Sequence, residues 1–223
     1  AERTAPAEAG EADKREALGL AEKSARVYYK EWNLTKALGL AAEALELDPY
    51  CLEAFSMLAV ISTNLGGGML FRKYLPDLRH MQRTCADEAL KQKIVFLLEH
   101  FEGSGGRLKA GARCLRLRPD DMEVLMLCGL MEAGRQNFKT AGEYFDRLKK
   151  LVPDPVFFGA VFAQRFRPPE SPEKQLEQAA AAVVAYPEVP TLRVALLGAL
   201  LDDGKLEEAE RQFPAALELA PSD

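Results

Sequence analysis

Apolar and small residues between positions 122 and 155 recur with the spacing of an α-helix, in two segments joined by a polar turn. The stripe residues are Leu125, Cys128 and Gly129 in the first segment and Ala141, Phe145 and Leu148 in the second. Residues Gly134–Asn137 separate the segments, and Pro153 ends the second because proline has no N–H for a helical hydrogen bond. The pattern predicts a helical hairpin over 122–155.

The same spacing extends along the chain. Pro119, Pro153, Pro187 and Pro221 are each 34 residues apart, a period typical of helix–turn–helix arrays. Pro49 lies 70 residues before Pro119, so we expect two additional residues near the glycines at 66–68, and Pro76 predicts a kinked or late helix there. The predicted pairs are 18–51, 52–87, 88–121, 122–155, 156–189 and 190–223. Residues 1–17 contain no large apolar residue and are expected to be a lead-in, partly helical or frayed.

Small residues on both helices of the first pair would let these helices approach closely. They are Ala21, Ser24 and Ala25 on one helix, followed by Tyr28, and Ala37, Ala41 and Ala44 on the other. With these stripes and the 34-residue period, residues 18–223 resemble the tetratricopeptide repeat family, most closely in the first, fourth and sixth pairs. The resemblance implies an all-α, right-handed superhelical solenoid of about six repeats, with one continuous core and a role in binding other proteins.

In this family the first helix of each pair lines the concave side, and the stripe beside its packing stripe faces a ligand. The corresponding residues here are mostly apolar: Val60, Phe96, Met126, Leu130, Phe157, Ala160, Gln164 and Val194. Family members that clamp an acidic peptide terminus have amides where this chain has Val60 and Leu130, so that mode is excluded. Two interpretations remain. The stripe binds an amphipathic helix or hydrophobic peptide, or it packs against a tighter superhelix of the array itself or against its N-terminal segment.

Charge is unevenly distributed along the chain. The net charge is −5, yet residues 70–118 contain 11 basic and 5 acidic residues. A secondary basic patch is expected from Arg72, Lys73, Arg79, Arg83, Arg107 and Arg113. A solvated face is one interpretation of it, and an anionic surface or nucleic acid is another; the low pI of 5.3 and the acidic flanks oppose nucleic acid. The apolar and basic segment 69–75 allows contact with a membrane surface, although burial within a repeat explains it better.

Catalytic and metal-binding patterns are absent from the sequence. The glycine-rich stretches at 66–68 and 103–106 lack the residues of a phosphate-binding loop, and the two histidines have no ligand-like spacing. The four cysteines form no CxxC pair, so we expect free thiols, a reducing compartment and a cytoplasmic location. No enzyme activity, cofactor, metal or small-molecule substrate is expected. Because the chain lacks an initiator Met, a fragment or processed form remains open.

The sequence therefore predicts a scaffold that binds a protein or peptide segment in a concave groove. The alternative is a non-catalytic assembly or regulatory subunit of a larger machine, with attachment to a membrane left open. The last predicted helix has a stripe with nothing after it to cover it, formed by Leu206, Ala209, Phe213, Ala216 and Leu217. An uncovered end of this kind predicts either a further segment in a longer protein or a contact with another molecule, with homodimer formation as the observable consequence.

Overall fold

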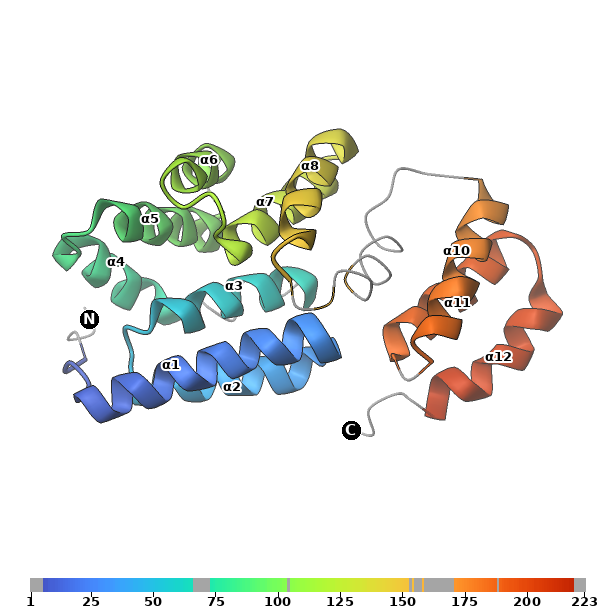
Figure 1. The fold of residues 1–223 in the computed structure, drawn as a ribbon, viewed down its shortest axis with the longest axis horizontal. Coiled ribbons are helices and arrows are strands. Elements are labelled where there is room, and N and C mark those ends of the chain that lie inside the picture. Colours follow the sequence, from blue (N-terminus) through green and yellow to red (C-terminus); the bar gives the residue numbers. More distant parts are fainter. Residues whose placement is uncertain are drawn as a thin grey trace. The chain divides into compact units, whose positions relative to one another are not determined.

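Every regular element in the described part of the chain is a helix, which confirms the all-α prediction (Figure 1). The computed structural model describes residues 6–65, 73–103, 105–152, 154, 158, 171–187 and 189–218. The chain divides into two compact units, Ala1–Pro153 and Asp154–Asp223, where the sequence had suggested one continuous core. None of the helices within the described ranges is long and apolar enough to cross a membrane.

The helices of unit 1 follow one another with short connections. They are α1 (Glu11–Arg26), the π-helical segment η1 (Val27–Glu31), α2 (Leu34–Leu47), α3 (Leu52–Leu65), α4 (Leu75–Thr84), α5 (Glu88–Glu102), α6 (Arg107–Leu117), α7 (Met122–Gly134) and α8 (Phe138–Lys149). Unit 2 contains α10 (Pro172–Ala185), α11 (Pro190–Asp202) and α12 (Leu206–Glu218). The predicted hairpin at 122–155 corresponds to α7 and α8, and Pro76 lies in the first turn of α4, as a late-starting helix requires.

Local sequence explains several helix starts. Asn33, Asp87, Asp121 and Ser171 each accept a hydrogen bond from the backbone N–H three residues later, which satisfies a donor left free at a helix start. In α1, Glu11 and Asp13 lie in the first turn and Lys23 and Arg26 in the last, so the charges complement the helix dipole. Because α1 begins at Glu11 and Ala17 is fully buried, the predicted end of the lead-in at residue 17 lies inside this helix.

Helix α3 is the centre of unit 1. It contacts α1 and α2 on one side and α5 and α7 on the other, so it lies between these two groups of helices (Figure 1). Its side chains from Leu52 to Asn64 are buried except for Glu53 and Thr63. The contact of α3 with α7 joins segments far apart in the sequence.

Two glycines allow the outer helices of unit 1 to approach α7 closely. A Cβ atom on Gly111 of α6 would lie 2.5 Å from Cys128 Sγ, and one on Gly129 of α7 would lie 2.5 Å from the Phe145 ring. Real Cβ atoms do not approach other atoms so closely, so a side chain at either position would have to displace Cys128 or the Phe145 ring.

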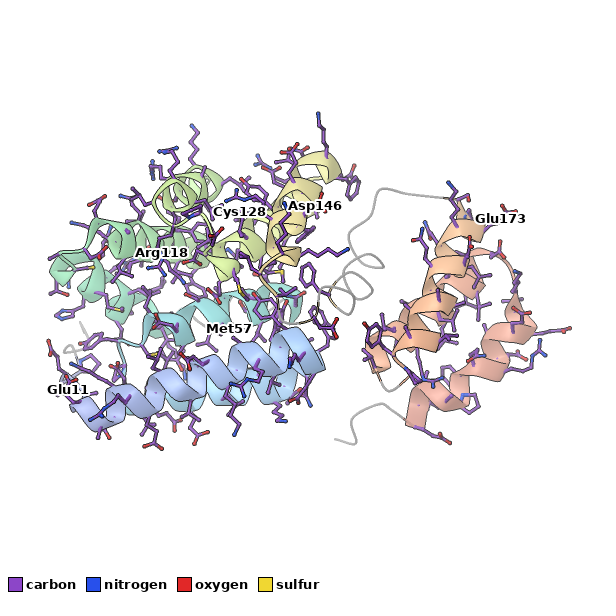
Figure 2. The ribbon with its side chains drawn as sticks, viewed as in Figure 1. Glu11, Met57, Arg118, Cys128, Asp146 and Glu173 are labelled. Carbon is purple, nitrogen blue, oxygen red and sulfur yellow. The ribbon has the colours of Figure 1, made fainter. Side chains whose placement is uncertain are left out.

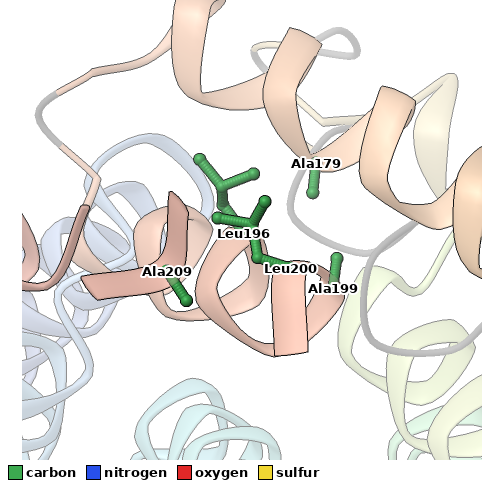
Figure 3. Close-up of a cluster of buried hydrophobic side chains, with 5 residues drawn as sticks. All are labelled: Ala179, Leu196, Ala199, Leu200 and Ala209. Atoms are coloured by element: carbon green, nitrogen blue, oxygen red, sulfur yellow. The ribbon is translucent and has the colours of Figure 1, made fainter. Parts of the chain in front are cut away.

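Unit 2 has a small core of its own around α11, which contacts both α10 and α12. Its buried residues are Ala179, Leu196, Ala199, Leu200 and Ala209 (Figure 3). On α12, the large side chains Leu206, Phe213 and Leu217 are instead more than half exposed. Their spacing of 7 and 4 residues puts them on one face of the helix, as the sequence predicted for an uncovered end.

Candidate partner-binding surfaces

The predicted concave groove is closed where the structure describes it. Val60, Phe96 and Met126 are fully buried and Leu130 is 6% exposed, because α3 contacts both α5 and α7 and their stripes face the interior. These four residues are core residues, which corrects their assignment to an open groove. Their burial favours the other interpretation, in which the stripe packs within the array itself. Val194 lies on α11 of unit 2 and is 62% exposed. Phe157, Ala160 and Gln164 lie outside the described residues.

The predicted basic patch divides between two helices. On and before α4, Lys73 has its ammonium 4.7 Å from the centre of the Tyr74 ring, Arg79 pairs with Glu102 at 2.7 Å, and Arg83 is exposed. On α6, Arg107 is half-buried and Arg113 is exposed. Arg72 lies outside the described residues. Because Arg79 is already neutralised, the positive charge available to an anionic partner on these two helices lies mainly on α6.

An open cleft of about 450 Å³ lies between α1, the turn before α3, the end of α4 and the start of α5. Its lining residues are Glu8, Lys14 and Leu18; Asp48, Tyr50, Cys51, Leu52 and Glu53; His80, Met81, Thr84 and Cys85; and Leu90 and Ile94. The lining combines apolar side chains with a polar rim, which is the usual composition of a binding site. No sequence motif indicated this cleft, because four separate segments form it.

One wall of the cleft is an aromatic pair that is held in place. The Tyr50 and His80 rings are stacked with their centres 5.3 Å apart. The Tyr50 hydroxyl donates to the Pro6 carbonyl at 2.9 Å, and its backbone N–H donates to Asp48 Oδ1 at 3.0 Å. Tyr50 is therefore fixed at both ends before any ligand binds, so a partner would not have to order this side chain.

The rim of the cleft is rich in carboxylates. Glu8 and Glu53 are exposed there, and the buried Asp48 lines the wall of the cleft. Lys14 lies among them, with its ammonium 3.9 Å from Glu8 and 3.5 Å from Glu11. Burial raises the pKa of the Cys51 thiol to about 11, and the neighbouring Glu53 and Asp48 charges act in the same direction. This thiol is protonated near neutral pH, which makes it a poor nucleophile. The cleft is suited to binding a cation beside an apolar group.

A buried ion cluster joins α5 to α7 elsewhere in unit 1. The Lys93 ammonium lies 3.0 Å from Asp121 and 3.2 Å from Glu123, and Asp121 also pairs with Arg118 at 3.0 Å. Burial alone would lower the pKa of Lys93, but the charges of Glu123 and Asp121 raise it above its ordinary value. Lys93 therefore stays charged and cross-links the two helices. Sequence reasoning missed this cluster, whose one visible signal is a lysine beside the apolar stripe of α5.

The remaining cysteine, histidine and carboxylate groups form neither a disulfide nor a metal-binding group within the ranges that the structure describes. All four cysteines are free, and Cys114 and Cys128 are buried between helices. Among the described side chains, no group of three His, Cys, Asp or Glu residues could hold a metal ion.

Comparisons with known proteins leave the chain without a family assignment. No protein-family model matches its sequence, and no curated protein matches it closely enough to be considered a relative.

Proposed function

We propose that this protein is a protein-interaction module built from tetratricopeptide-like helical pairs, and that the cleft beside Tyr50 and His80 holds a segment of its partner. The 34-residue period and the successive contacts of α1 with α2, α5 with α6 and α7 with α8 support the repeat architecture. The cleft carries the functional proposal, because it is open, whereas the four described residues of the predicted stripe in unit 1 are buried.

The cleft favours a peptide with a basic side chain next to an apolar one. Leu18, Met81 and Leu90 supply apolar contacts, and the Tyr50–His80 pair supplies a flat surface. The exposed carboxylates of Glu8 and Glu53 would attract a lysine or arginine of the partner, and the buried Asp48 carboxylate adds negative charge nearby. A volume of about 450 Å³ fits one or two side chains, so this cleft would anchor a short segment.

We also propose that the module is non-catalytic and works in a reducing, cytoplasmic compartment. Three of its free cysteines, Cys51, Cys114 and Cys128, have a pKa of about 11 or higher because burial disfavours the thiolate. They act as small apolar side chains. A role as the assembly or regulatory subunit of a larger machine uses the same binding surface and is the second candidate.

A selection of peptides tests the proposed site. A randomised peptide library is panned on the wild-type protein, and bound sequences are expected to be enriched in Lys or Arg adjacent to Leu, Ile or Met. The selected peptides are then titrated against Thr84→Arg, which introduces a cation into the cleft from an exposed position. Thr35→Arg, on an exposed part of α2, is the control.

We expect Thr84→Arg to weaken binding at least about tenfold, which corresponds to about 1.4 kcal/mol, and Thr35→Arg to bind as the wild type does. Enrichment of acidic peptides, or equal binding by both variants, would remove the cleft as the site.

A further inference from the structure

Helix α6 has an unusual charge composition. Between Gly103 and Pro119 the chain contains five basic residues and no acidic one, although the protein as a whole has a net charge of −5. The five are Arg107, Lys109, Arg113, Arg116 and Arg118. Opposite charges three or four residues apart normally stabilise an exposed helix, and α6 forgoes that stabilisation entirely.

Three of these cations form one stripe. The inner face of α6 buries Ala110, Gly111, Cys114 and Leu115 against α5 and α7. Lys109, Arg113 and Arg116 are exposed, and their spacing of 4 and 3 residues puts them together on the opposite face. Nitrogen-tipped side chains extend outward from α6 in Figure 2. Because Gly111 fits tightly against Cys128, the stripe lies on a helix whose position is fixed.

The positive charge of this stripe is not neutralised by the parts of the chain that the structure describes. Arg118 pairs with Asp121 and Arg79 with Glu102, but Lys109, Arg113 and Arg116 form no ion pair with any described residue. The first turn of α6 has no acidic residue and Gly106 provides no side-chain cap, although the Glu99 carboxylate of α5 lies beside Gly106. Arg107 and Lys109 lie near the positive end of the helix dipole, where cations are unfavourable. Along the exposed stripe, Lys109, Arg113 and Arg116 repel one another, and negative groups from outside would relieve this repulsion.

We propose that the Lys109–Arg113–Arg116 stripe docks an acidic helix of a partner protein, with carboxylates spaced three and four residues apart along that helix. Two parallel helices with this spacing present opposite charges in register, which favours charge-assisted pairs. A nucleic acid would also meet the rest of the chain, which is acidic. The pI of the whole protein is 5.3. A membrane surface would require apolar insertion, and Leu117 is the one large apolar side chain exposed on α6.

Fluorescence anisotropy with a labelled synthetic peptide tests this proposal. The probe is an alanine-rich helical peptide with glutamates spaced three and four residues apart on one face. A second peptide of the same composition has its glutamates distributed around the helix. The Arg113→Glu/Arg116→Glu variant removes the stripe. The control is Lys149→Glu/Lys150→Glu, which makes the same change in net charge at two exposed positions, the last residue of α8 and the residue after it.

We expect the patterned peptide to bind, the Arg113→Glu/Arg116→Glu variant to lose at least about tenfold in affinity and the control variant to lose about twofold or less. Binding should also weaken as salt is raised from low to physiological concentration. No binding, equal binding of both peptides, equal loss in both variants, or tighter binding to duplex DNA or to phosphatidylserine vesicles would each overturn the proposal. Circular dichroism of both variants checks that they remain helical. Because the cleft residues are unchanged, this outcome is independent of the peptide selection at the cleft.

Discussion

Glycine packing determines how closely α7 and α8 approach each other. Gly129 on α7 leaves no space for a Cβ atom beside Phe145, whereas a Cβ atom on Gly142 of α8 would meet nothing within 4 Å. The two glycines lie on neighbouring helices of one hairpin, yet they have opposite roles. Gly129 is required because the Phe145 ring occupies the space of a side chain, whereas Gly142 only adds conformational entropy to the unfolded state.

The substitution Gly129→Ala is expected to destabilise the protein by about 1–3 kcal/mol, because the new methyl group collides with the Phe145 ring. Gly142→Ala should stabilise it by about 0.5–1 kcal/mol. Chemical denaturation of both variants measures the two changes. Equal effects of the two substitutions would show that α7 and α8 do not approach as closely as described.

His100 is a neutral imidazole held between α3 and α5. Its Nε2 lies 3.0 Å from Thr63 Oγ1, and the Thr63 hydroxyl donates to the Ala59 carbonyl, so we assign the Nε2 proton as the donor to Thr63. His100 Nδ1 is buried without a hydrogen-bond partner in the described structure. Burial, with a smaller contribution from the Arg107 charge, lowers the pKa of His100 from 6.5 to about 4.

This lowered pKa predicts a loss of stability in mild acid. The unfolded chain binds the His100 proton near pH 6.5 and the folded protein only near pH 4. The contribution of His100 to the free energy of unfolding is therefore fully present above pH 6.5. It is lost as the pH falls from 6.5 to about 4, and the total loss is about 3 kcal/mol. Denaturation at pH 7 and pH 4.5 should show this decrease for the wild type and a smaller one for His100→Gln. If the free energy of unfolding falls with pH as steeply in His100→Gln as in the wild type, another group is responsible for the titration.

At the scale of the element, the α7–α8 hairpin depends on its small-residue stripe. Ala141 is fully buried on α8, facing α7, while its neighbour Glu143 is exposed. Ala141→Trp should destabilise the protein by at least about 1–3 kcal/mol or prevent folding, because the indole cannot fit between the helices. Glu143→Trp should change the melting temperature little. Similar melting curves for the two variants would mean that the register of α8 is wrong.

Local periodicity predicted the elements well but not the surface they leave open. The spacing of Leu125, Cys128 and Gly129 identified α7 and its packing stripe. Pro153, the predicted end of the hairpin, lies outside the described residues, and α8 ends at Lys149. The neighbouring stripe with Met126 was assigned to a groove rather than to the core, since period alone does not reveal which distant helix covers it. The contact of α3 with α7 decides this, and it spans too much sequence to be read from local pattern.

The cleft and the buried ion cluster were hidden for the same reason. Tyr50 and His80 come from different hairpins, and neither residue is unusual in its own segment. Lys93 finds Asp121 and Glu123 on another helix, and the sequence shows only a lysine beside an apolar stripe. The π-helical segment η1 and the left-handed Trp32, with φ of 50°, also had no sequence signal that we recognised.

At the scale of the whole molecule, the exposed face of α12 predicts self-association. Leu206, Phe213 and Leu217 present apolar surface on one face of this helix. Light scattering over a concentration series should detect dimers that Leu217→Glu weakens. Val184→Glu changes a more exposed residue of α10 and is the control, expected to leave association unchanged. A strict monomer at high concentration would rule out this contact.

The central claim is that a partner binds at the Tyr50–His80 cleft and that the stripe through Val60, Phe96 and Met126 is core. Hydroxyl-radical footprinting of the methionines, read by mass spectrometry, tests both parts in one experiment. Met81 lines the cleft and is partly exposed, whereas Met57 and Met126 are buried. In the free protein we expect rapid oxidation of Met81 and almost none of Met57 and Met126. A saturating peptide from the selection should protect Met81 and leave the other two unchanged. The account would be contradicted if Met126 is oxidised in the free protein and the peptide suppresses this oxidation while Met81 is unaffected. That result would indicate that the stripe forms an open groove.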